Sequence, residues 1–235
     1  MAISLSHRQK AIAVLLLAGL VFYLLSWSSF GRLAQWPFII LTTFIHELGH
    51  GLTAIVVGGE FVSMHLYADA SGLAKLRLPN NGLSRALAAA GGLLAPSLFG
   101  GVLIWAGRST KRSSRVFLAL SIVMLFSCIL WIRSLFGLTV IGGLGVGFLA
   151  LARLRRPGLH QFLIQFIGVH MLVDTLTRTL GYLMSSSAKV DGSIRHSDTA
   201  AIADALVGPP LLYGILIAIS ALSIFWFSLR ATYFR

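Results

Sequence analysis

Long apolar stretches restrict what this chain can fold into. A bilayer core about 30 Å thick needs about 20 mainly apolar residues per helix, and several stretches here are long enough. The fourth and fifth stretches are separated only by Arg133 and Ser134, so they form either a tight hairpin or one kinked element. The pattern predicts an all-α membrane protein, a polytopic bundle of six or seven transmembrane helices. The expected spans are residues 11–29, 36–58, 84–106, 116–132, 135–151, 160–184 and 210–229.

Composition supports a membrane location and argues against a nucleic-acid partner. Hydrophobic residues make up 57% of the chain and charged residues 11%, against roughly 25% charged in soluble proteins. The net charge is +12, but the basic residues gather at the ends of apolar stretches, where lipid headgroups lie. We therefore expect the lipid bilayer, and not a nucleic acid, as the partner of these residues. The basic groups are Arg108, Lys111, Arg112 and Arg115, then Arg153, Arg155 and Arg156.

The chain is expected to be one multi-pass membrane domain spanning residues 1–235. Its first apolar stretch is long for a signal peptide and has no clean cleavage site, so we interpret it as an uncleaved span. Compactness and the lack of an organelle-targeting segment favour a bacterial inner membrane. Orientation in the membrane and oligomeric state stay open. Cys128 is the single cysteine, so any metal must be held by His, Asp or Glu.

Two segments break the apolar pattern. From Glu60 to Leu78, apolar and polar side chains alternate around an Asp-Ala-Ser-Gly turn, which predicts a small β-hairpin directly after the second span. From Ser185 to Asp198 the chain is polar, and we expect a flexible loop. The end of that loop resembles the N-cap of a short helix running to Val207.

The second expected span contains the motif His46-Glu47-Leu48-Gly49-His50. Histidines four residues apart share one face of a helix, so both imidazoles can reach one Zn²⁺ ion. The Glu47 carboxylate can take a proton from a water at that metal and later hand it to a leaving amine. Ionisable groups cost free energy inside a membrane span and are usually there for function. The motif predicts one zinc ion per chain, with Glu47 as the catalytic residue.

The residues around this motif resemble the site-2 protease family of intramembrane zinc metallopeptidases. The resemblance covers the segment FIHELGHGLTA from Phe44 to Ala54, then Gly58-Gly59 and the hairpin. It implies hydrolysis of a peptide bond in or beside a membrane span of a substrate, with His46 and His50 as zinc ligands and Glu47 as general base. The segment 61–68 resembles the family's extended strand, which holds an unwound substrate by strand addition. An interfacial hairpin without that role is the alternative.

The third zinc ligand is the weak point of the resemblance, because the family's Asn-x-x-Pro segment ending in Asp-Gly is absent. A catalytic zinc normally has three protein ligands and one open position. Asp174 is our predicted third ligand, since it is the acid deepest in an apolar stretch apart from Glu47. Arg178 lies four residues on and could instead form an ion pair with it. His170 and Asp198 are the alternatives, although an acid before a helix is more often a cap.

The sequence therefore predicts an intramembrane zinc metalloprotease that cleaves membrane-anchored protein substrates. One rival is a catalytically inactive homologue that acts as a binding or regulatory protein, which a missing third ligand would support. The other is a metal or solute transporter that uses polar residues along a pathway, although the chain has no evident inverted repeat.

Overall fold

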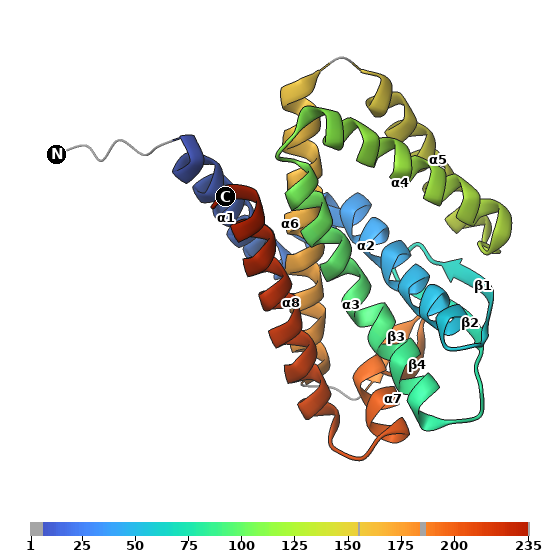
Figure 1. The fold of residues 1–235 in the computed structure, drawn as a ribbon. Coiled ribbons are helices and arrows are strands. Elements are labelled where there is room, and N and C mark those ends of the chain that lie inside the picture. The colour runs from blue at the N-terminus through green and yellow to red at the C-terminus, as the bar shows by residue number, and fades with distance from the viewer. Residues whose placement is uncertain (1–6, 155, 184–186, 235) are drawn as a thin grey trace.

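The computed structural model describes residues 7–154, 156–183 and 187–234 (Figure 1). Within these residues the chain forms eight helices and four strands. In chain order they are α1 (His7–Ser26), α2 (Ser29–Val56), β1 (Glu60–Leu66), β2 (Gly72–Arg77), α3 (Gly82–Ala106), α4 (Thr110–Leu130), α5 (Leu135–Arg153), α6 (Pro157–Leu183), β3 (Ser187–Val190), β4 (Ser193–His196), α7 (Asp198–Ala205) and α8 (Pro210–Tyr233).

Six of the described helices are long and apolar enough to cross a membrane: α2, α3, α4, α5, α6 and α8. The apolar part of α1, Ile12–Ser26, is shorter than the others. The described residues thus contain six candidate spans, the lower of the two predicted numbers, and the predicted helical bundle is confirmed. The fourth and fifth spans are the separate helices α4 and α5, which run side by side as a hairpin (Figure 1).

Helix α2 carries the His-Glu-x-x-His motif in its C-terminal half. It begins after Ser28, whose side-chain oxygen accepts a hydrogen bond from the Gly31 N–H at 2.9 Å, a typical N-cap. At the level of the motif, α2 and α3 approach closely because Gly49 has no side chain. A Cβ on Gly49 would lie 2.6 Å from the Gly91 carbonyl oxygen of α3. Small residues at such crossings are typical of membrane helices, and here they bring α3 up to the histidines.

The predicted hairpin after α2 is confirmed as an antiparallel pair of β1 and β2, with a register shift between Phe61 and Ser63. The edge of β1 that faces away from β2 also forms backbone hydrogen bonds. Met64 donates its N–H to the Trp131 carbonyl at 2.7 Å and accepts the Arg133 N–H at 2.9 Å from the loop between α4 and α5. Strand β1 is therefore flanked on both sides, and β2 forms the outer edge of the sheet.

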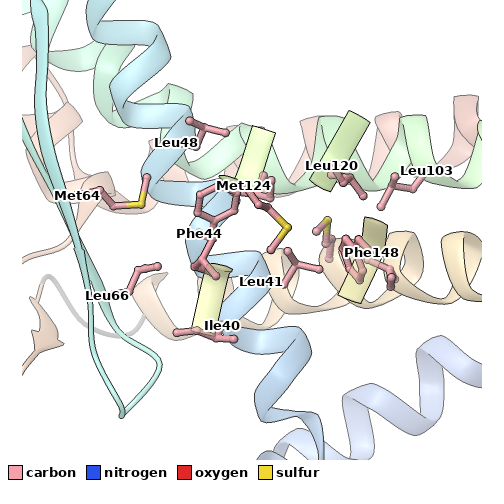
Figure 2. Close-up of a cluster of buried hydrophobic side chains, with 14 of the residues drawn as sticks. Ile40, Leu41, Phe44, Leu48, Met64, Leu66, Leu103, Leu120, Met124 and Phe148 are labelled. Atoms are coloured by element: carbon pink, nitrogen blue, oxygen red, sulfur yellow. The ribbon is translucent and has the colours of Figure 1, made fainter. Parts of the chain in front are cut away.

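A hydrophobic core joins the hairpin to the helices around α2. The buried side chains of Phe44 and Leu48 of α2, Met64 of β1, Met124 of α4 and Phe148 of α5 belong to this core, which is drawn in Figure 2. Phe44, Met64 and Met124 have no solvent-exposed surface. Interiors of this kind are densely packed and resist deformation. The core therefore fixes the hairpin against the side of the helix that carries the motif.

The segment predicted as a flexible loop instead contains a second antiparallel hairpin, formed by β3 and β4. Its turn places Asp191 and Gly192 at φ 46° and 76°, the left-handed pair that a two-residue type I′ turn requires. The Asp191 N–H donates to the Ser71 hydroxyl oxygen at 3.2 Å, so the tip of the second hairpin meets the turn of the first. Ser197 then caps α7, as the sequence predicted.

Candidate metal centre

Two histidines and one carboxylate meet near the motif end of α2. His46 Nε2 and His50 Nε2 lie 3.0 Å apart. Asp198 at the start of α7 places Oδ2 3.0 Å from His46 Nε2 and Oδ1 3.4 Å from His50 Nε2. One donor atom from each of the three residues lies within 4.8 Å of the others, and no further group of this kind was found in the part of the chain that the structure describes. Residues 148 positions apart thus form one potential metal site.

His50 is held in one orientation by the backbone of α3. Its Nδ1 lies 2.8 Å from the Ala88 carbonyl oxygen, which can only accept a hydrogen bond, so Nδ1 carries the proton. The lone pair of the imidazole is then on Nε2, which faces His46 and Asp198. Metal-binding histidines commonly donate their other N–H in this way, and the bond fixes both the tautomer and the ring. The local structure suits a metal ligand.

Gly92 of α3 leaves the space that the His50 ring occupies. A Cβ on Gly92 would lie 2.2 Å from His50 Nε2, so even alanine must displace the imidazole. We expect Gly92→Ala to lower zinc affinity by about tenfold or more, the range found when the support of a metal ligand is disturbed. Competition with a fluorescent zinc chelator measures this affinity.

The matched control for that variant is Gly143→Ala. Gly143 also lies in a membrane helix, α5, and a Cβ there would meet nothing within 4 Å. It should keep wild-type zinc affinity, because alanine favours a helix and meets no obstacle. Equal zinc affinities in the Gly92→Ala protein and the control would show that the imidazole tolerates the added methyl group.

Asp198 is free to face the histidines because Ser197 performs the capping role. The Ser197 hydroxyl oxygen accepts the Ala200 N–H at 3.3 Å, and Asp198 occupies the first turn of α7. Burial by itself would raise the pKa of Asp198, but His50 in its doubly protonated, metal-free form and hydrogen bonds with both histidines hold that pKa well below its usual range. The carboxylate is therefore ionised at neutral pH, as a metal ligand must be.

Glu47 lies beside this cluster and is held by the first hairpin. Its side chain is buried, and Oε2 accepts a hydrogen bond from the Ala74 N–H of β2 at 2.7 Å. Gly72 makes room for it, since a Cβ there would lie 2.7 Å from Glu47 Oε1. The carboxylate is thus fixed between the motif helix and the edge strand, with lone pairs left to accept a proton.

Asp174, the predicted third ligand, is not part of the cluster. Its Oδ2 accepts a hydrogen bond from Arg178 Nε at 2.8 Å, the ion pair that the sequence left open as its alternative role. His170 is buried against the rings of Phe22 and Phe38, with centroids 4.9 and 5.4 Å away. The structure therefore brings His46, His50 and Asp198 together and places Asp174 and His170 elsewhere.

A cleft of about 430 Å³ opens over Glu47 and the cluster. Strand β2 and helix α3 form two of its walls, and the second hairpin with α7 forms another. Small side chains line much of it, including Ala74, Ala88, Ala188 and Ala201. The volume falls within the usual range of ligand sites, roughly 300 to 1,000 Å³.

The donor set fits zinc. Two imidazole nitrogens and one carboxylate are a common protein ligand set of catalytic zinc sites, and they leave a fourth position for water or substrate. Hard ions such as Mg²⁺ and Ca²⁺ prefer sites made mostly of oxygen ligands, which this cluster does not offer. The local support of His50 and the ionised state of Asp198 agree with that assignment.

The fold and the site together define a class: a polytopic helical protein with a metallopeptidase motif inside one of its apolar helices. Comparison with known proteins identifies its family. The chain matches the sequence model of the Peptidase M50B-like family over residues 14–228, and it belongs to this family. The resemblance to site-2 proteases is thereby confirmed. No curated protein and no solved structure matches the chain.

The sequence did not predict the groups that hold the candidate site residues in place. The Ala88 carbonyl that holds His50 is a backbone atom and leaves no signal in the sequence. Gly92 carries no signal in the sequence, because glycine is common in membrane helices, and its proximity to the imidazole depends on how α2 and α3 cross. The second hairpin had a signal that could have been used, the Asp191-Gly192 pair between strand-forming residues.

Proposed function

We propose that this protein is an intramembrane zinc metallopeptidase that hydrolyses peptide bonds of membrane-anchored protein substrates. The observation that carries the proposal is the meeting of His46, His50 and Asp198 beside Glu47 at the floor of one cleft. Six apolar helices of spanning length and the family assignment support a membrane-embedded peptidase. A bacterial inner membrane is the location we propose.

The residues divide into ligands and a base. His46 Nε2, His50 Nε2 and one Asp198 oxygen would hold one zinc ion per chain. Bound zinc supplies Lewis-acid chemistry, which polarises the scissile carbonyl and makes water more acidic. The Glu47 carboxylate accepts the proton of the attacking water and then donates it to the nitrogen of the leaving amine. The Ala74 N–H keeps the carboxylate aimed during both transfers.

The open edge of β2 is the element we propose to bind the substrate. The sequence suggested the segment 61–68 for this role, but among the described residues β1 has backbone partners on both sides, whereas β2 pairs with β1 alone and gives its Ala74 N–H to Glu47. Strand β2 also lines the cleft through Gly72, Ala74 and Leu76. An extended substrate segment can add to such an edge by backbone hydrogen bonds, next to Glu47. A substrate helix would have to unwind locally first.

Both rival functions receive less support. An inactive homologue would be favoured by a missing third ligand, but the Asp198 carboxylate lies 3.0 Å from His46 Nε2 and supports the proposal of a complete ligand set. A transport pathway would need polar groups in series, but His170 and Asp174 are each engaged away from the histidine pair. The peptidase is therefore the function we propose.

Removal of the metal tests the proposal directly. Purified wild-type protein is expected to hold about one zinc ion per chain and to cleave a model transmembrane substrate. Treatment with a chelator should lower the rate at least about 100-fold, and added Zn²⁺ should restore it. Elemental analysis gives the zinc content, and gel electrophoresis of the substrate gives the rate.

Two results would count against the function. Protein purified without chelators that holds no zinc would remove the basis for the mechanism. Cleavage that continues in zinc-free protein would point to a contaminating protease or to another catalytic group. A substrate whose span is replaced by an uninterrupted polyleucine helix serves as the control, because it resists the local unwinding that strand addition requires.

A further inference from the structure

A chain of three hydrogen bonds links α6 to the turn of the first hairpin through α2. Asp174 accepts from Arg178 Nε at 2.8 Å, Arg178 Nη2 donates to the Thr43 hydroxyl oxygen at 2.9 Å, and Thr43 donates to the Ala70 carbonyl at 2.8 Å. The side chains of Asp174 and Arg178 are 14% and 28% exposed, and Thr43 is buried. Ionisable groups at such positions cost free energy, so a role beyond mutual neutralisation is expected.

The Thr43 hydroxyl bonds to Arg178 and to the hairpin at the same time. A buried threonine in a helix usually donates to the carbonyl four residues back, and its neighbour Thr42 does so, to Phe38 at 3.0 Å. The Arg178 guanidinium can only donate, so its bond occupies the Thr43 oxygen as an acceptor. The hydroxyl hydrogen of Thr43 is then available for the Ala70 carbonyl of the hairpin.

The hydrogen bond from Thr43 to Ala70 is important because the β1–β2 turn is strained and lies close to the Glu47 carboxylate. Ala70 has φ 63°, a left-handed conformation that a residue other than glycine seldom adopts. Thr43 and Glu47 lie one turn apart on the same face of α2. Thr43 holds the hairpin at the Ala70 carbonyl, and Glu47 holds it at the Ala74 N–H. Gly72 lies between these points and against both side chains.

We propose that Asp174, Arg178 and Thr43 are positioning residues that fix the β1–β2 turn on α2, so that the open edge of β2 presents a substrate strand to the metal centre in one register. The inference rests on the proposed peptidase function. It gives the intramembrane ion pair of α6 a role in substrate binding rather than in metal binding. Arg178 also lines the cleft itself, so this attachment lies where substrate would enter.

The test compares Thr43→Val with Thr43→Ser and with Thr42→Val. Valine at position 43 removes both hydrogen bonds at nearly constant volume, and serine restores the hydroxyl. We expect Thr43→Val to raise KM for the model transmembrane substrate about tenfold, the effect of losing one hydrogen bond of ordinary strength, with less change in kcat. Zinc affinity should stay at the wild-type level. Thr43→Ser and Thr42→Val should keep a KM close to wild type.

Amide hydrogen exchange of the hairpin gives a second readout that needs no catalysis. Residues 70–74 should exchange faster in Thr43→Val than in wild type or Thr42→Val, because the turn has lost the hydrogen bond that holds Ala70 on α2. Unchanged exchange together with unchanged KM would overturn the inference, as would a Thr43→Ser protein that behaves like Thr43→Val. Absence of cleavage or zinc in wild type would instead count against the peptidase function, and exchange would still decide whether the turn is held in this way.

Discussion

Glu47→Gln is expected to abolish cleavage while the protein keeps its zinc. The glutamine oxygen can still accept the Ala74 N–H, so the hairpin and the side chain should stay where they are. An amide cannot accept the proton of the attacking water at neutral pH. General acid–base catalysis contributes about 10² to 10⁴ in rate, and the variant should lose a factor in that range. Initial rates on the model transmembrane substrate measure the loss.

The chain offers a matched control, because Glu60 is its one other glutamate. Glu60 lies on β1 of the same hairpin and forms an exposed ion pair with Arg77 at 2.7 Å. Exposed pairs of this kind contribute little to stability, so Glu60→Gln should keep full activity. A Glu47→Gln protein that cleaves at more than a tenth of the wild-type rate would remove Glu47 from the role of base.

Asp198→Asn should lose the metal, whereas Asp174→Asn should keep it. The Asp198 oxygens lie 3.0 and 3.4 Å from the two histidine nitrogens, and a neutral amide is a much weaker zinc ligand than a carboxylate. We expect zinc affinity to fall at least about 100-fold in Asp198→Asn, more than the loss of an outer support would cause. Zinc content and chelator competition on both variants give the comparison.

Asp174→Asn is expected to lower the stability of the protein and not its zinc affinity. It removes the negative charge of the ion pair with Arg178 in a partly buried position, where the cost should be smaller than the about 3 to 5 kcal/mol typical of a fully buried pair. Its thermal midpoint should fall although its zinc affinity does not. If Asp174→Asn instead lost zinc and Asp198→Asn kept it, the ligand set predicted from the sequence would be restored and the arrangement around α7 would need revision.

The candidate site residues that lie together on α2 could be predicted from the sequence. A helix fixes the relation of His46 to His50 by its own geometry, so spacing alone predicted two candidate ligands and a candidate base. The first hairpin was predictable because alternation of apolar and polar side chains is also a local signal. Both predictions concern residues close in the sequence, where backbone geometry limits the distances that are possible.

The third donor could not be chosen in this way, because it arrives from a distant part of the chain. Asp174 was preferred for its place in an apolar stretch, but its nearest cation is one turn away and satisfies it. Asp198 resembled a cap, and Ser197 turned out to perform that role. Which of the two acids reaches α2 depends on how α7 packs against α3, a long-range contact that local patterns do not report.

The place of Asp198 in the chain has a thermodynamic consequence. A metal ion held by His46, His50 and Asp198 would tie α2 to α7 across 148 residues, a loop that contains four of the six spanning helices. Such a tie acts like a long-range cross-link, since closing a large loop in the unfolded chain costs conformational entropy. The free energy of metal binding then becomes part of the free energy of folding. Zinc binding would therefore strengthen the attachment of α7 to α2, in addition to making the site active.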